Sequence, residues 1–397
     1  MPDSRFLHSS PPAARAGVRA LRSSKIREVA NAGMGKKDVI AFWFGEPDEV
    51  TPEFIRRAGI DALERGETFY THNLGIPPLR EAIACYVSGL HRPQAAPLAM
   101  ENIAVTSSGM SALMLATQAL VAPGDRVVIV TPVWPNLVEI PRILGADAVT
   151  FPLTYSAAGW TLDLERLLAT LTPGTRMLYI NSPNNPTGWT ISSAEQHAIL
   201  EHCRRLGIWI LTDDAYERLY YDNGVAPSFL SITDTQDRII SANTFSKSWL
   251  MTGWRLGWIV APRELAPDFS TLLEYNTSCA PSFVQSAGVV AVEQGEAVIE
   301  RTRARFHKAR DFLVERLNAI PGVEASLPPG AMYVFFKVHG MSDSLAFCKK
   351  LVAESSLGLA PGIAFGPEGE GFVRWCFASS EPRLAEGVAR LRRSLAS

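Results

Sequence analysis

The sequence has few cysteines, and none of them is arranged to bind zinc or to build a disulfide framework. Its 397 residues include five cysteines, which are scattered along the chain and form no C-x-x-C pair. An odd number of scattered cysteines argues against both kinds of site and favours a reducing compartment. We therefore expect a cytoplasmic protein with no metal site.

An excess of charge of one sign is also absent. Lys and Arg number 38 against 40 Asp and Glu, which gives a formal net charge of −2. Such a balance excludes a broad basic field for nucleic acid or for an anionic membrane. The chain also has no apolar run long enough to cross a bilayer and no internal repeat. A hydrophobic content of 47% with 20% charged residues instead indicates a globular protein, and the length suggests two or three domains.

The N-terminal segment is the most basic part of the chain. Its first 27 residues contain a single acid, Asp3, against six bases: Arg5, Arg15, Arg19, Arg22, Lys25 and Arg27. A transit peptide can have such a composition. We expect instead a mobile arm that becomes helical from about Ala14, and the segment lacks the apolar stretch of a secretory signal.

From residue 102 onward, strand-like and helix-like segments alternate. The run Arg126–Val130 has no polar alternation, which is typical of a strand buried on both faces. This alternation predicts an α/β fold with a mostly parallel central sheet flanked by helices. After Pro281, long helices and short strands predict a smaller α+β domain. We place an N-terminal arm and part of the small domain at residues 1–45, a large domain at 46–283 and a small C-terminal domain at 284–397.

Polar clusters follow four of the predicted strands, at Ser107–Ser111, Asn181–Gly188, Asp213–Tyr216 and Thr244–Lys247. Because ligands bind beyond the carboxyl ends of parallel strands, we expect these clusters to meet at one site. The first cluster opens a helix, and helix N-termini favour phosphate, although an ordinary strand–helix turn would look the same. Asp213 and Asp214 could also cap a helix, and no histidine lies nearby to support a metal pair.

The fourth cluster contains one lysine, Lys247, which follows Thr244 and Ser246 and precedes Arg255. A lysine amine is a nucleophile for a carbonyl group, and hydroxyls and a guanidinium can hold phosphate oxygens. Any one lysine is more often solvated than catalytic. Arg374 is less easily explained as structural, because it interrupts an apolar strand where a charge is expensive unless it is paired or binds an anion.

These segments resemble the fold-type I, pyridoxal-phosphate-dependent class I/II aminotransferases of the aspartate aminotransferase superfamily. The resemblance runs from about Ser23 to the C-terminus, and five motifs occur in the same order: Gly45-Glu-Pro-Asp48, Phe69-Tyr-Thr71, Asn184-Asn-Pro-Thr-Gly188, Asp213-Asp-Ala-Tyr216 and Ser246–Gly257. It implies a pyridoxal 5'-phosphate cofactor, a two-stage exchange between an amino acid and a 2-oxo acid, and a homodimer. It also implies cis peptide bonds at Pro132 and Pro186.

The resemblance implies a role for each polar group around the cofactor ring. Lys247 would hold the cofactor covalently and then carry the proton between the substrate's α carbon and the cofactor. Asp213 would pair with the pyridine nitrogen and keep it protonated, so that the ring acts as an electron sink. Tyr216 and Asn185 would donate to the phenolic oxygen of the ring.

The resemblance also implies how the phosphate and the substrate are held. The phosphate contacts would come from Ser108, Gly109, Met110, Thr244 and Arg255, with Tyr70 reaching in from the neighbouring subunit. Trp134 would stack on the ring. Arg374 would grip the substrate α-carboxylate as a bidentate pair, with Gly45 and Asn185 on the same side.

One departure from the family pattern concerns the substrate side chain. Some members that act on aspartate carry a lysine at the position of Met110, and a methionine cannot bind an acidic side chain. Phe44, Met110 and Trp134 would form an apolar wall. We therefore expect a preference for neutral, apolar or aromatic amino acids over aspartate.

Two other functions compete with amino-group transfer. A pyridoxal-phosphate-dependent C–S or β-lyase, or a cyclising synthase, would use the same scaffold, because a fold does not determine its reaction. A transcription regulator with an aminotransferase-like sensor would need a DNA-binding domain ahead of the match, and fewer than about thirty residues precede it.

Overall fold

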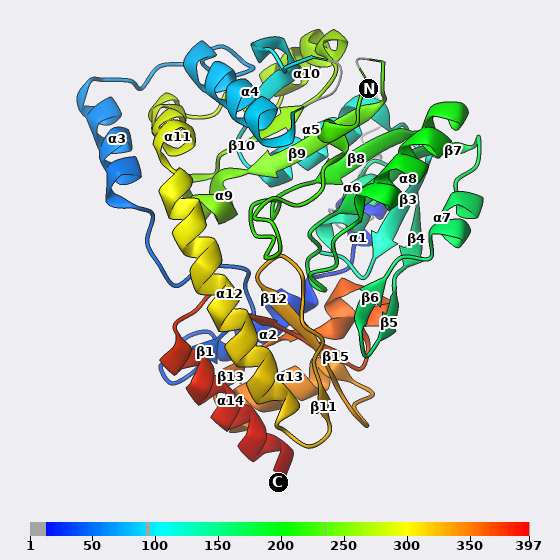
Figure 1. Ribbon diagram of the computed structural model, residues 1–397, viewed down its shortest axis with the longest axis vertical. Helices are drawn as coiled ribbons and strands as arrows, with labels where there is room; N and C mark the ends of the chain where they lie inside the picture. The colour runs from blue at the N-terminus through cyan, green and yellow to red at the C-terminus, as the bar shows by residue number, and fades with distance from the viewer. Residues whose placement is uncertain (1–12, 93–95, 235, 397) are drawn as a thin grey trace, which may run out of the picture.

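Runs of β-branched and aliphatic residues form the central sheet of the computed structural model, which describes residues 13–92, 96–234 and 236–396. Its seven strands lie in the spatial order β2 (Ile103–Thr106), β10 (Gly257–Val260), β9 (Ile239–Thr244), β8 (Trp209–Asp213), β7 (Thr175–Asn181), β3 (Arg126–Thr131) and β4 (Asp147–Pro152). Only β10 runs antiparallel to its neighbours in this sheet. The predicted α/β fold with a mostly parallel sheet is confirmed (Figure 1).

Helices cover both faces of this sheet, so alternate residues of one strand enter different cores. Val127 and Ile129 of β3 pack with α5 (Gly109–Leu120), α6 (Asn136–Ile143) and α10 (Ala266–Glu274). Val128 and Val130 face the other core, which includes α7 (Leu164–Thr170) and α8 (Ser193–Leu206). A third core, under β2 and β10, includes α4 (Pro77–His91) and α11 (Ser282–Gln294), and α3 (Glu53–Glu64) packs on α11. Burial on both faces explains why these strands lack polar alternation.

A second, antiparallel sheet has the order β11 (Val323–Glu324), β12 (Tyr333–Val338), β15 (Phe372–Cys376) and β14 (Ala360–Pro361). The helices α2 (Lys25–Gly33) and α13 (Ser344–Glu354) pack together beside it, next to the pair β1 (Ile40–Ala41) and β13 (Leu357–Gly358). Figure 1 shows this sheet below the larger one, with the long α12 (Glu296–Asn318) running beside both. The N-terminal segment therefore packs against the last quarter of the chain.

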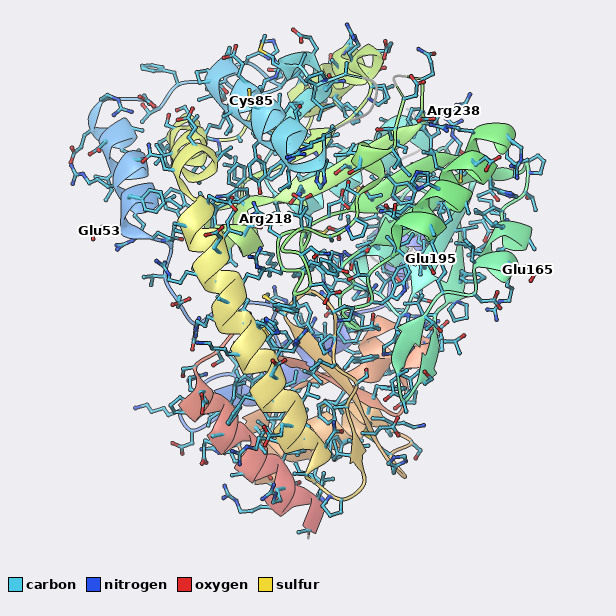
Figure 2. All side chains as sticks on the ribbon, viewed as in Figure 1. Glu53, Cys85, Glu165, Glu195, Arg218 and Arg238 are labelled. Carbon is cyan, nitrogen blue, oxygen red and sulfur yellow. The ribbon has the colours of Figure 1, made fainter. Side chains whose placement is uncertain are left out.

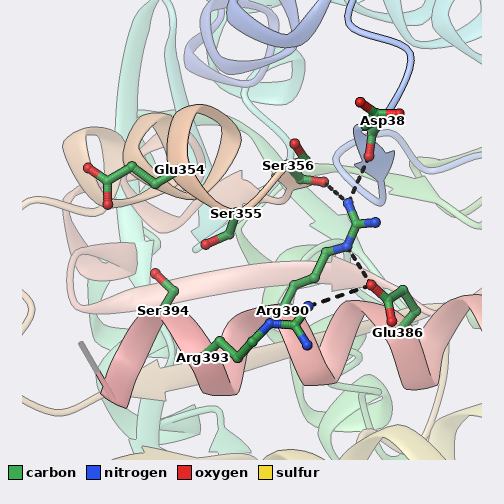
Figure 3. Close-up of a pocket in the computed structure, with 8 residues that line it drawn as sticks. All are labelled: Asp38, Glu354, Ser355, Ser356, Glu386, Arg390, Arg393 and Ser394. Carbon is green, nitrogen blue, oxygen red and sulfur yellow. Dashed lines mark hydrogen bonds and ion pairs between the residues drawn. The ribbon is translucent and has the colours of Figure 1, made fainter.

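Two arginines, the buried Arg218 and the half-buried Arg390, fasten helices to their neighbours. Arg218, which lies in the segment after β8 and is labelled in Figure 2, forms an ion pair with Glu296, the first residue of α12. Arg390 of α14 (Glu381–Ala396) donates to the carbonyl oxygens of Asp38 at 2.7 Å and Ser356 at 2.8 Å (Figure 3). The two hydrogen bonds of Arg390 therefore join α14 to the segments that lead into β1 and β13.

Several features differ from the predictions or add to them. The hairpin β5 (Thr154–Ser156) and β6 (Gly159–Thr161) was not predicted, and its Trp160 packs on Phe335 and Phe372 of the second sheet. The predicted cis bond at Pro132 is confirmed, but the one at Pro186 is wrong, because the second cis bond precedes Pro183. Residues 184–188 form a turn closed by the N–H of residue 188 on the carbonyl of residue 184 at 2.8 Å.

The N-terminal arm is only partly within the described residues. Residues 1–12, which include most of the predicted mobile part, lie outside them. The described part begins with a short helix, α1 (Ala16–Arg19), ahead of α2. Among the described residues no helix is both long and apolar enough to cross a membrane.

Candidate active site

A cavity of about 560 Å³ lies beyond the carboxyl ends of β7, β8 and β9 and is closed on the other side by α2, β12 and β15. It brings together all but two of the predicted site residues: Gly45, Gly109, Met110, Trp134, Asn185, Asp213, Tyr216, Thr244, Lys247, Arg255 and Arg374. The four polar clusters that follow separate strands therefore meet at one place, as the topology of a parallel sheet requires.

Lys247 lies in α9 (Phe245–Ser248), the short helix that directly follows β9. Its Nζ donates to the carbonyl oxygen of Gly45 at 2.6 Å and lies 5.9 Å from the ring centroid of Tyr216. Burial lowers the pKa of Lys247 to about 8; the Cys376 thiol opposes this effect and the Arg374 charge adds to it. Part of the amine is therefore unprotonated near neutral pH, as a nucleophile or a base requires.

Asp213 is the last residue of β8 and is buried. Its Oδ1 accepts a hydrogen bond from the Ala215 backbone N–H at 3.2 Å. Burial raises the pKa of Asp213 to about 6, although that hydrogen bond and the charge of Lys247 act in the opposite direction. A cation beside this carboxylate would offset the desolvation and keep it ionised. The neighbouring Asp214 is used differently, because its Oδ2 accepts from the hydroxyls of Thr212 and Ser241.

The end of the cavity near α5 has the features of an anion site. Gly109 and Met110 form the first turn of α5, where backbone N–H groups are free and the helix dipole favours negative charge. A Cβ at Gly257 would lie 2.5 Å from the Gly109 nitrogen, so β10 and the start of α5 approach each other as closely as backbones can. Only glycine permits that contact.

Two more groups line the same end. Thr244 donates its hydroxyl to Ser246 Oγ at 2.8 Å. Arg255 has a left-handed backbone with φ of 53° and donates to the Thr252 carbonyl at 2.6 Å. Hydroxyls, a guanidinium and a helix N-terminus on one wall match the donor set that binds phosphate.

Arg374 of β15 lies at the opposite end, where it is 2% exposed. Its guanidinium donates to Asn185 Oδ1 at 2.9 Å and to the Trp43 carbonyl, and it lies 4.4 Å from the ring of Tyr333. Its Nε–H has no hydrogen-bond partner among the described residues, and no carboxylate there pairs with it. A buried, unpaired guanidinium is costly, and an incoming carboxylate would satisfy it.

Two predicted residues do not line the cavity. Ser108 is the N-cap of α5, with φ of 141°, and its Oγ accepts from the Ser111 N–H at 3.1 Å. Tyr70 is 89% exposed and lies away from the cavity of its own chain.

The cavity also has walls that the sequence reasoning missed. Tyr333 of β12 donates to or accepts from Tyr216 through their hydroxyls at 2.7 Å. In the sequence Tyr333 stands in an apolar strand and has the signature of a core residue. Ile26 and Arg27 of α2 also line the cavity, and the Arg27 guanidinium lies 5.2 Å from the Phe44 ring. In the sequence, the only feature that singled out Ile26 and Arg27 was their place in the basic N-terminal segment.

Comparisons with known proteins agree with this geometry. A model of the family described as aminotransferase class I and II matches residues 37–391. The chain is 35% identical to an aspartate aminotransferase of Pyrococcus horikoshii, over 95% of this chain and 96% of that one. The fold is similar to the solved structure of an aspartate aminotransferase from Thermotoga maritima, with a TM-score of 0.89, 32% identity and coverage of 97% and 100%. An aromatic aminotransferase from Pyrococcus horikoshii superimposes with a TM-score of 0.85, 31% identity and coverage of 93% and 98%.

Proposed function

The chain belongs to the class I and II aminotransferase family, and from this premise we propose that it moves the amino group of a neutral, apolar or aromatic L-amino acid to a 2-oxo acid. Enzymes of this family and fold use pyridoxal phosphate, so the chain is a pyridoxal-phosphate-dependent aminotransferase. The observation that carries the proposal is one cavity that holds a lysine with a lowered pKa, a buried unpaired arginine and an anion site.

The residues of the cavity fit this cofactor. The anion site at the start of α5 would take the phosphate, with Thr244 and Arg255 as further donors. Asp213 is a buried carboxylate that forms no ion pair with a cation of the described residues, which suits a protonated ring nitrogen. Tyr216 and Asn185 would donate to the oxygen on the ring. Bound pyridoxal phosphate supplies a carbonyl carbon that takes up the amino group and a ring that delocalises the electron pair left at the α carbon.

The rest of the chemistry falls to side chains of this chain. Arg374 would hold the α-carboxylate, which places the α carbon on the Lys247 side of the cavity. Lys247 Nζ would remove the proton from that carbon, since its lowered pKa leaves part of it unprotonated. Without the cofactor, the carbonyl of Gly45 accepts from Nζ at 2.6 Å and so orients the amine toward this side of the cavity.

The apolar lining supports the proposed substrate class. Phe44, Met110 and Trp134 line the cavity, and Met110 Sδ already accepts from Asn136 Nδ2 at 3.4 Å. Apolar side chains gain from burial against such a wall, whereas a carboxylate would be desolvated there. The named relatives act on different side chains, aspartate in one and aromatic in another, so membership of the family leaves this preference open.

A second copy of the chain would complete the site. Phe69, Tyr70 and Tyr275 are each more than four-fifths exposed, and their segments are joined by a 2.6 Å hydrogen bond from Asn73 to Glu274. Clustered exposed aromatics mark interaction surfaces. We infer a homodimer in which Tyr70 reaches the phosphate of the neighbouring subunit. The free cysteines suit a cytoplasmic location.

A donor screen tests this function. The protein loaded with pyridoxal phosphate is mixed with leucine, methionine, phenylalanine or aspartate, and loss of the visible absorbance of the cofactor is followed. We expect the three neutral donors to discharge the band and to give larger kcat/KM values than aspartate. A kcat/KM for aspartate far above the other three would contradict the substrate class. Release of pyruvate with ammonia from an added amino acid that carries a sulfur leaving group on Cβ, such as cysteine, would identify a lyase.

A variant pair tests the apolar wall directly. Met110→Lys places a cation among the lining groups and should raise kcat/KM for aspartate by about ten- to a hundredfold, the usual value of one charge-assisted contact. Met110→Gln, which has a similar length and no charge, serves as the matched control and should leave the ratio of aspartate to leucine within a few fold. An equal change in both variants would show that size, and not charge, controls the preference.

A further inference from the structure

Tyr333 lies where three parts of the site meet. It is 1% exposed, and its hydroxyl is 2.7 Å from that of Tyr216. Its ring centroid lies 4.4 Å from the Arg374 guanidinium, and its hydroxyl oxygen lies 1.9 Å from the position that a Cβ on Gly45 would take. One side chain of the second sheet therefore contacts the group assigned to the cofactor ring oxygen, the group assigned to the substrate carboxylate and the segment whose carbonyl orients Lys247.

We propose that Tyr333 is a positioning residue that donates its hydroxyl proton to Tyr216, turns the Tyr216 proton toward the cofactor ring oxygen, and supports Arg374 with its ring. The inference rests on the proposed function and adds to it a residue of β12 that the sequence motifs did not include.

The direction of the hydrogen bond follows from the number of protons. A phenol hydroxyl carries one proton and can accept through its oxygen. If Tyr216 donates to the ring oxygen, its proton is used there, and the 2.7 Å contact must be made by the proton of Tyr333. Burial raises the pKa of both phenols, so both hydroxyls keep their protons near neutral pH. If Tyr216 instead donated its proton to Tyr333, the ring oxygen of the cofactor would face a lone pair of the Tyr216 oxygen.

The packing prevents the Tyr333 hydroxyl from turning away. A Cβ at position 45 would lie 1.9 Å from the oxygen and 2.9 Å from Cζ, so the hydroxyl has the Gly45 backbone directly beside it. The Arg374 guanidinium also lies 4.8 Å from the ring of Phe365, which leaves it in contact with two aromatic rings. Because β12 and β15 pair in register, with Phe335 opposite Arg374, the ring and the guanidinium are held by the same sheet.

The expected consequence is a more acidic cofactor. Hydrogen bonds in a chain strengthen one another, so a Tyr216 that accepts from Tyr333 is a stronger donor to the ring oxygen. A stronger donor stabilises negative charge on that oxygen. The pH at which the visible absorbance of the bound cofactor changes should therefore be lower than it would be without Tyr333.

The test compares two variants of Tyr333 with a remote tyrosine. In the loaded protein, Tyr333→Phe should raise the pKa of the visible absorbance change by about 0.5 to 1 unit, as expected for loss of one hydrogen bond. It should lower kcat about two- to tenfold and change KM for the amino acid by less than about threefold, because the ring on Arg374 remains. Tyr333→Leu also removes the ring and should raise KM by a further tenfold or so.

Tyr155→Phe is the matched control, since the Tyr155 hydroxyl donates to Glu324 at 2.8 Å outside the cavity. It should titrate like the wild type. A Tyr333→Phe titration that coincides with the wild type, or one shifted to lower pH, would overturn the inference while leaving the proposed function intact. A wild-type protein that develops no visible band with excess pyridoxal phosphate would overturn both.

Discussion

A single methyl group at Gly45 should destabilise the protein through Tyr333. In Gly45→Ala the new Cβ would lie 1.9 Å from the Tyr333 hydroxyl oxygen, 2.9 Å from Cζ and 3.3 Å from Cε1. Distances below 3.0 Å between such atoms are not tolerated, so one side must move. Tyr333 has little freedom to do so, since its hydroxyl is bonded to Tyr216 and its ring lies against Arg374.

The magnitude can be estimated from these contacts. Forcing an extra methyl group into a packed interior costs about 1–3 kcal/mol. Displacing Tyr333 also breaks its hydrogen bond with Tyr216, which is worth about 0.5–1.5 kcal/mol. We therefore expect Gly45→Ala to lose roughly 2–4 kcal/mol of unfolding free energy. In a Tyr333→Phe background the atom at 1.9 Å is absent and the nearest contact is the one at 2.9 Å. The cost of Gly45→Ala should then fall by about 1–2 kcal/mol, a coupling typical of residues in contact.

Urea unfolding of the cofactor-free wild type, both single variants and the double variant measures this coupling. The four proteins are compared at one concentration, because subunit association also contributes to stability. Gly253→Ala is the control, since a Cβ there meets nothing within 4 Å. A Gly45→Ala protein no less stable than Gly253→Ala, or the same loss in both Tyr333 backgrounds, would refute the packing at this junction.

Three further changes have expected outcomes. Lys247→Met should stabilise the cofactor-free protein at pH 7, because folding buries an amine whose pKa falls from 10.5 to about 8. Between those two pH values the unfolded wild-type chain binds more protons than the folded one, so wild-type stability should rise from pH 8 to 10.5. The difference in urea midpoint between Lys247→Met and the wild type should therefore shrink over this range. A difference that does not shrink would contradict the lowered pKa of Lys247. Asp213→Asn should lower kcat by about 10²–10³ while the cofactor still binds, and a loss under tenfold would argue against pairing with the ring nitrogen. Gly89→Ala, at an exposed position of α4 with open space around its Cβ, should add about 0.5–1 kcal/mol to the unfolding free energy in urea, and no gain would contradict the local geometry.

The sheet could be predicted from the sequence because burial on both faces leaves a strong local signal. β3 and β7 are nearly continuous apolar runs, and polar residues follow β7 at once. The strand β10 was missed, since Gly257–Val260 begins at the last residue of the lysine motif and continues no strand–helix alternation. Its antiparallel pairing with β2 and β9 is a property of the assembled sheet.

The candidate site was predictable only where a residue type is unusual for its place. Arg374 stands out because a charge interrupts a buried strand. Tyr333 does not stand out, because an aromatic residue in an apolar strand is the common case, and only the 2.7 Å contact with Tyr216 distinguishes it. Arg27 enters the cavity because α2 packs on α13, a contact between the two ends of the chain that no local pattern records.

The cavity holds two buried charges whose desolvation destabilises the chain. Asp213 and Arg374 are both buried, yet neither forms an ion pair with any described residue. Each charge is held by neutral partners, a backbone N–H for Asp213 and an amide oxygen with a carbonyl for Arg374. If Asp213 and Arg374 formed an ion pair with each other, their attraction would offset the cost of desolvating both charges. Neither charge would then be free to bind a ligand. Because they do not pair, both desolvation penalties stay in place. In the proposed function, Asp213 would meet the protonated ring nitrogen of the cofactor and Arg374 would meet the carboxylate of the amino acid. The unfavourable burial of Asp213 and Arg374 therefore contributes to binding energy when a ligand pairs with them. A substitution that places an oppositely charged side chain beside either group should weaken binding at that group.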